Sequence, residues 1–282
     1  MSCRIISIVL VMASSLTNNL FGDGPFSITP SEVAMKGKFD QAQLLVTATA
    51  GERGPASAED FTRTASFTSS NDQVAVVSAS GRVFPRGDGT AEIAIKVGDV
   101  VQTVKVAVTG VVPEPVIDYL EQVRPVLYKA GCNMGACHAA QHGQGGFKLS
   151  VFGFDPAADR TAMARDVLGR RINQINPTES LLLRKPTMQV PHSGGRRLEV
   201  GSPDYELLSS WIRAGAPGPA AERPISKLVV TPNHRLGEPG LTQQLRVDVV
   251  YADGASRDVT AWAKFDSMDE GLVSVSRDGY CT

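Results

Sequence analysis

The chain has 282 residues, enough for about two domains. Apolar residues make up 42% of it and charged residues 20%, so it can form packed cores and is not an intrinsically disordered polymer. A net charge of -1 argues against a general nucleic-acid binder, which usually carries a basic excess. The sequence has no stretch of 18 apolar residues, so no transmembrane helix is expected.

Residues 1–22 have the pattern of a secretory signal peptide. Arg4 is the only early charge, and a short apolar run over residues 5–13 follows, interrupted only by Ser7. Small residues come next, as at a cleavage region. We therefore expect an exported protein, in the periplasm or at the cell surface, although a buried first strand would also fit this run.

Residues 25–111 are predicted to form a β-sandwich. Short β-prone runs recur at roughly ten-residue spacing and are separated by Gly, Pro, Asn and Asp turn signals. No helical stripe of apolar residues competes with this pattern. The expected strands cover residues 26–30, 44–49, 61–67, 74–78, 91–97 and 101–108.

Residues 225–282 repeat this β pattern. The segment from Asp60 to Gly81 matches the segment from Asp258 to Gly279 at a constant offset, since 258 − 60 and 279 − 81 both equal 198. Earlier matches are Ile28-Thr29-Pro30 with Val230-Thr231-Pro232 and Gln43-Leu44 with Gln244-Leu245. The sequence therefore predicts two copies of one β-module. The last strands of the first copy have no counterpart in the second, so we expect an incomplete second module and a chain that is part of a longer protein.

Residues 113–219, between the two copies, are bounded by pairs of prolines and have a different character. A first helix is expected over residues 116–130, with Pro125 as a kink or break. A second is expected from the N-cap Ser202 to the stop at Gly215. The rest is expected to be mostly loop, with residues 147–154 extended.

The most informative motif follows the first of these helices. Cys132 and Cys137 are followed directly by His138, which is the order of residues in the C-x-x-C-H motif that attaches haem c. In that motif two thiols form thioethers with the porphyrin vinyl groups, and the histidine ligates the iron. Here four residues rather than two separate the cysteines, and Gly135 allows the extra residues to bulge outward.

The middle segment resembles the planctomycete-type cytochrome c domain, and the flanking modules resemble bacterial Ig-like group 2 domains. The whole arrangement resembles large exported planctomycete multidomain proteins. The resemblance implies a small, mostly α haem domain between Ig-like domains, with one covalent haem c held by Cys132, Cys137 and His138. It rests on Arg124-Pro125-Val126-Leu127, the segment from Cys132 to His138, Ser180-Leu181-Leu182-Leu183, Pro191-His192 with Gly194-Gly195, and Trp211-Ile212 with Gly215-Ala216-Pro217.

A second iron ligand is expected in the loop before the last helix, where the resemblance places it. His192 is the first choice, because neighbouring glycines let the backbone approach a flat ring, and Met188 is the second. His142 and Met134 are poorly placed to reach the opposite face of the ring. The choice matters because a methionine ligand raises the reduction potential relative to a second histidine.

Other interpretations of the cysteines remain open. Cys132 and Cys137 could form a disulfide in an oxidising compartment. With His138 and His142 they also have the ligand types of a zinc site, although adjacent Cys137 and His138 would crowd one tetrahedral ion. Three basic pairs could neutralise the haem propionates or simply lie in solvent: Arg170-Arg171, Arg184-Lys185 and Arg196-Arg197.

The sequence thus favours an exported electron-transfer module that carries one haem c and serves a redox partner not identified by the sequence, or further domains of the same chain. One alternative is a cell-surface adhesion or scaffold protein with a structural cysteine pair and no redox role. Another is a haem with an open iron position for catalysis or gas sensing. No nucleophile triad, phosphate-binding loop or carboxylate pair indicates an enzyme active site.

Overall fold

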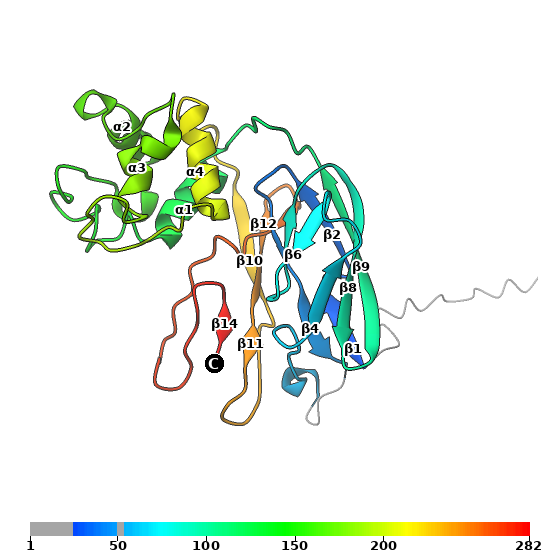
Figure 1. The fold of residues 1–282 in the computed structure, drawn as a ribbon. Coiled ribbons are helices and arrows are strands. Elements are labelled where there is room, and N and C mark those ends of the chain that lie inside the picture. The colour runs from blue at the N-terminus through cyan, green and yellow to red at the C-terminus, as the bar shows by residue number, and fades with distance from the viewer. Residues whose placement is uncertain (1–24, 50–53) are drawn as a thin grey trace, which may run out of the picture.

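A computed structural model describes residues 25–49 and 54–282. The predicted signal peptide over residues 1–22 lies outside these residues. Figure 1 shows the helices α1 to α4 gathered together, with β-strands before and after them in the chain. We call these parts the first β-module (residues 25–111), the middle domain (residues 113–219) and the second β-module (residues 225–282).

The first β-module is built from several small sheets. A four-stranded sheet has the order β2-β9-β8-β5, with β2 and β9 parallel, and two further sheets have the orders β3-β7-β6 and β1-β4. Alternate residues of β8, among them Ile93 and Ile95, are fully buried, as expected for strands with one face on a core. The strands are β1 (Phe26–Thr29), β2 (Glu32–Lys36), β3 (Ala42–Gln43), β4 (Leu45–Ala48), β5 (Ser66–Ser69), β6 (Ala75–Val77), β7 (Arg82–Pro85), β8 (Gly89–Val97) and β9 (Val100–Thr109).

One predicted strand of this module is largely wrong. Residues 61–65 form a turn, and β5 begins only at Ser66. The Asp60 carboxylate accepts hydrogen bonds from the backbone N–H and the hydroxyl of Thr62, at 2.9 and 2.5 Å, which closes a local turn that competes with a strand. The predicted runs also omitted β2, β3 and β7.

The second β-module reproduces part of this arrangement. Strand β10 pairs antiparallel with β12 as β1 pairs with β4, and β11 pairs with β14. The two sheets have the orders β10-β12-β13 and β11-β14. The strands are β10 (Ile225–Thr231), β11 (Gln243–Gln244), β12 (Arg246–Tyr251), β13 (Ser256–Asp258) and β14 (Tyr280–Cys281).

The two β-modules touch through reciprocal hydrogen bonds. The backbone N–H of Gln43 donates to Asp258 Oδ2 at 2.6 Å, and the N–H of its counterpart Gln244 donates to Asp60 Oδ2 at 2.5 Å. In each module the other carboxylate oxygen accepts from the N–H of the threonine two residues on. Equivalent surfaces of the two copies therefore meet, as in a two-fold symmetric dimer interface.

The middle domain is more helical than expected. A π-helix over Tyr119–Val123 runs directly into α1 (Arg124–Lys129), so the first helix starts three residues later than predicted and Pro125 lies in the first turn of α1. Residues 147–154 are extended only in part, because Ser150 has an extended backbone but a 3-10 turn covers Val151–Gly153. The expectation of mostly loop missed two helices. The remaining helices are α2 (Pro156–Ala164), α3 (Leu181–Arg184) and α4 (Pro203–Arg213), with short 3-10 turns at Val167–Gly169 and Pro177–Glu179.

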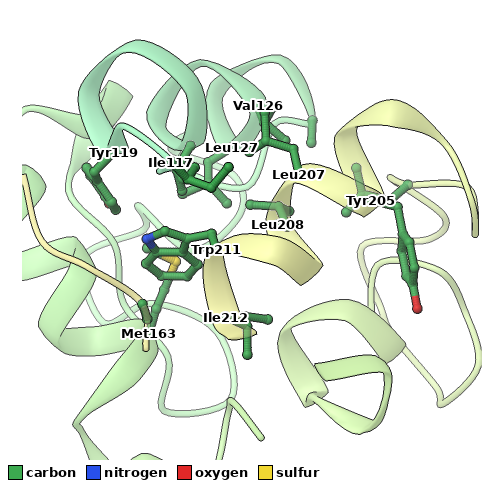
Figure 2. Packing of buried hydrophobic residues seen from close by; sticks show 14 of the residues in the cluster. Ile117, Tyr119, Val126, Leu127, Met163, Tyr205, Leu207, Leu208, Trp211 and Ile212 are labelled. Atoms are coloured by element: carbon green, nitrogen blue, oxygen red, sulfur yellow. The ribbon is translucent and has the colours of Figure 1, made fainter. Parts of the chain in front are cut away.

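Helix α4 follows its sequence signals. The Ser202 side chain accepts from the N–H of Tyr205, Pro203 begins the helix, and Gly215 adopts a φ of 88° just after it. Its inner face carries the core of the middle domain. Figure 2 shows Trp211 among apolar side chains from α1, α2 and α4. The rings of Trp211 and Tyr119 lie 5.9 Å apart, and the Trp211 indole donates to the carbonyl of Pro217 at 3.0 Å.

The core of the middle domain includes side chains from both β-modules. Phe39 of the first module and Ala261 and Trp262 of the second are buried in the same apolar cluster as Trp211. Lys129 Nζ, at the end of α1, donates to the carbonyl of Ala261 at 2.5 Å. The middle domain is therefore packed directly against both modules rather than tethered between them.

Over residues 25–49 and 54–282, we find no helix with the length and apolar character that crossing a membrane requires.

Candidate functional site

A cavity of about 380 Å³ lies in the middle domain and brings distant segments together. Its walls come from the end of α1, from residues 131–138, which we call the cysteine loop, and from residues 144–149. Helix α3, the loop before α4 and Leu208 of α4 complete them. Cys132, Cys137, His138 and His192 all line it. Three of these four residues are neighbours in sequence, but His192 reaches the cavity only through the fold.

The cysteine loop begins where α1 stops. Gly131 has a φ of 78°, which turns the chain away from the helix axis. The N–H of His138 donates to the carbonyl of Cys132 at 3.1 Å and closes the loop. Of the four intervening residues, Gly135 and Ala136 are exposed whereas Asn133 is buried. The predicted outward bulge is thus limited to the second half of the loop.

Both cysteines of the loop are free thiols in this structure, so it contains no disulfide between Cys132 and Cys137. Burial raises the pKa of the Cys132 thiol to about 11, and repulsion from Cys137 acts in the same direction. Cys132 is therefore a neutral thiol at physiological pH rather than a reactive thiolate.

The two cavity histidines face one another. The ring centroids of His138 and His192 are 6.3 Å apart, and the ring planes differ by only 14°. His138 Nδ1 lies 3.0 Å from the carbonyl oxygen of Phe147, and His192 Nδ1 lies 2.8 Å from that of Gly195. A carbonyl oxygen only accepts, so Nδ1 carries the hydrogen in each ring, and in a neutral imidazole the lone pair would then lie on Nε2.

The electrostatics favour a neutral imidazole at His138. Burial lowers its pKa, and the nearby positive charges of His192, Arg171 and Lys185 lower it further, while the hydrogen bond to Phe147 opposes them. A neutral imidazole whose second nitrogen donates to a carbonyl is the usual state of a metal-ligating histidine.

The other sequence candidates lie elsewhere. Met188 is 44% exposed, with a φ of 61°, and does not line the cavity, so the structure brings His192 but not Met188 opposite His138. His142 is exposed and also lies outside the cavity lining. In the part of the chain that the structure describes, no three His, Cys, Asp or Glu side chains gather as a metal site would require, so the zinc alternative is not assembled.

All four charged residues that line the cavity are cations. Arg170, Arg171, Lys185 and Arg197 contribute to its walls, and no carboxylate does. The other members of the two later basic pairs point elsewhere, Arg184 to Glu179 and Arg196 to Glu199. An apolar cavity ringed by cations suits a ligand with an apolar body and anionic ends.

Two contributors to the site were not predicted from the sequence. The backbone carbonyl of Phe147 orients His138, and Gly194 packs against the other imidazole: a Cβ atom there would lie 2.9 Å from His192 Cε1. The glycines after His192 gave a signal for close backbone approach. Nothing in the residue type of Phe147 pointed to the role of its carbonyl.

These residues fit a haem c. The imidazoles of His138 and His192, whose ring centroids lie 6.3 Å apart, are the nitrogen ligands that would hold the iron. Cys132 and Cys137 line the same cavity as the paired histidines, and the cations suit the propionates.

Comparisons with known proteins concern the β part of the chain. A family model described as Big-like, a bacterial Ig-like domain, matches residues 63–110, so the Ig-like character predicted for the first β-module is confirmed. A solved structure titled "Structure of the S-layer protein SbsC, domains 5-6" matches with 24% identity and a TM-score of 0.24, covering 32% of this chain and 45% of that one. A TM-score this low does not establish a shared fold. No curated protein matches the chain.

Proposed function

We propose that the middle domain binds one haem c, which Cys132, Cys137 and His138 would hold with His192 as the second iron ligand, and that the protein is an exported one-electron carrier. The observation that carries this proposal is the opposed pair of histidines, with ring centroids 6.3 Å apart and ring planes within 14°. Their Nδ1 hydrogens are held by backbone carbonyls, which leaves both Nε2 atoms free.

Bound haem would supply an iron that cycles between two oxidation states. The residues of the chain would hold the haem and shield it from solvent. The carbonyls of Phe147 and Gly195 fix the imidazole tautomers, and apolar side chains such as Leu127 and Leu149 line the cavity, where they would shield bound haem from water. Arg170, Lys185 and Arg197 would provide partners for the anionic groups of the cofactor. Ligation by two histidines would give a lower reduction potential than a His–Met pair.

The test is to produce the full chain in a host with haem c maturation and to record its spectrum and mass. We expect covalently bound haem with the spectrum of six-coordinate, low-spin iron. His192→Ala should convert the site to a five-coordinate spectrum or lose most of the haem, because it removes the second ligand. Met188→Ala and His142→Ala are matched controls outside the cavity lining and should leave the spectrum unchanged.

Two outcomes contradict the proposal at different points. A colourless protein whose mass equals that of its amino acids would overturn haem binding altogether. A coloured protein whose spectrum changes in Met188→Ala but not in His192→Ala would overturn the ligand assignment while leaving the haem.

The second candidate function is a structural or adhesive protein of the cell surface with no redox role. The observation in its favour is the bacterial Ig-like match over residues 63–110, since this domain fits a surface or extracellular protein. The predicted periplasmic or surface location agrees with either function. The haem measurement separates the two, because a purely structural protein would carry no chromophore.

A further inference from the structure

Arg171 is an unusual cation in this domain. Only 6% of its surface is exposed, yet no carboxylate of the described residues forms an ion pair with it. Its guanidinium instead donates to three backbone carbonyls, those of Gly146 at 2.7 Å, Ala162 at 2.9 Å and Asp166 at 3.3 Å. A buried arginine is normally paired with an acid, whereas this one lies beside the cavity without an ion pair in direct contact, and the Asp166 carboxylate attracts it only from a greater distance.

A single aromatic side chain connects Arg171 to His138. The guanidinium carbon lies 4.7 Å from the centroid of the Phe147 ring, and that ring lies 4.5 Å from the imidazole of His138. The backbone of the same segment holds His138 twice. The Phe147 carbonyl faces Nδ1, and the N–H of Leu149 donates to the His138 carbonyl at 2.8 Å. Arg171 also fixes the residue before Phe147 through the carbonyl of Gly146.

We propose that Arg171 is a positioning residue for the metal site: it orients His138 through Phe147 and places a permanent buried charge next to the cavity. This inference rests on the proposed haem function. Its fork of donors holds the turn over residues 144–147 against α2, which keeps the Phe147 carbonyl aimed at His138.

The charge has a separate consequence for redox chemistry. An oxidised iron site carries one more positive charge than the reduced site, so a nearby cation that solvent does not screen disfavours oxidation. Arg171 should therefore raise the reduction potential. Arg170 lines the same cavity but is exposed, so its charge is screened by water and should have a smaller effect.

The experiment compares Arg171→Gln, Arg171→Lys and the control Arg170→Gln in the full chain. We expect the reduction potential of the haem-loaded protein to fall in Arg171→Gln, to stay close to wild type in Arg171→Lys, which keeps the charge, and to change little in Arg170→Gln. In the unloaded protein, ¹⁵N NMR of the imidazole should show one tautomer, with the hydrogen on Nδ1, in the wild type and a mixture in Arg171→Gln.

Equal potentials in wild type and Arg171→Gln, together with an unchanged His138 tautomer, would overturn the inference. A potential shift of the same size in Arg170→Gln would also contradict it, since burial would then not matter. If Arg171→Gln does not fold, Phe147→Leu tests the link instead, because it removes the ring and keeps the carbonyl. If the wild type takes up no haem, the proposed function fails, but the tautomer measurement still decides the positioning role.

Discussion

The two β-modules share a local pattern but differ in what covers it. Each has an aspartate that closes a turn two residues on, at Asp60 and Asp258, and each offers that carboxylate to the other module. Phe26 is fully buried in the first module, whereas its counterpart Leu228 is 62% exposed. The first module covers its strands with the long β8–β9 pair, and residues 225–282 contain no counterpart of that pair. Local sequence thus sets the turns and pairings, while burial depends on which strands lie over them.

The largest loss of stability is expected at Asp258, because the reciprocal contact between the two β-modules includes an ion pair on that side only. Asp258 forms an ion pair with Arg246 at 2.9 Å, with both side chains largely buried, whereas Asp60 accepts from neutral donors. Asp258→Asn should cost about 3 kcal/mol of unfolding free energy, because the buried Arg246 loses one of its two ion pairs and keeps only the one with Asp248. Asp60→Asn should cost about 1–3 kcal/mol, since it places an amide donor against a backbone donor.

Urea unfolding of the full chain measures both losses. Asp253→Asn serves as the control, because Asp253 pairs with Arg223 at the surface of the second module and its loss should change little. If Asp258→Asn lowers the free energy of unfolding no more than Asp60→Asn does, the ion pair with Arg246 does not make the Asp258 contact the stronger of the two.

The difference in burial gives the next prediction. Ile93→Ala should destabilise the chain by about 2–5 kcal/mol, because it leaves a cavity at a fully buried position of β8 in the first module. Leu228→Ala should change stability by no more than about 0.5 kcal/mol, because most of that side chain already lies in water. Thermal unfolding of the two variants is the measurement. A large loss in Leu228→Ala would mean that something covers this face in solution.

The smallest effect concerns the contact between the middle domain and the second module. Burial lowers the pKa of Lys129 from 10.5 to about 8, helped by the positive charges of Arg82 and Arg277. Between these two pH values the unfolded chain binds more protons than the folded chain, so stability should rise with pH in this window. Lys129→Met should remove about 1 kcal/mol of that rise, after allowance for solvent. Denaturation at about pH 7.5 and about pH 10 measures the difference, and parallel profiles for the two proteins would contradict it.

The sequence predicted some elements well and others poorly, for physical reasons. Helix α4 has an N-cap serine, a proline at its first position and a terminal glycine, so its limits could be read directly. Helix α3 has only four residues, too few for a periodic signal, and the strand expected over residues 61–67 lost most of its length to the Asp60 turn. The repeat was visible because the same residue types recur at one offset.

By itself, the sequence determined the chemistry available to this protein: two β-modules with matching residues at one offset, and a cysteine–cysteine–histidine cluster after a helix. These are local properties, set by residue type and spacing. Only the tertiary structure decided that His192 rather than Met188 faces His138, that a carbonyl of Phe147 holds the imidazole, and that four cations and no acid surround the cavity. The two histidines are 54 residues apart in the chain (192 − 138 = 54), and Phe147 is nine residues from His138 (147 − 138 = 9). These contacts and the ring of cations form through packing, which no local pattern encodes.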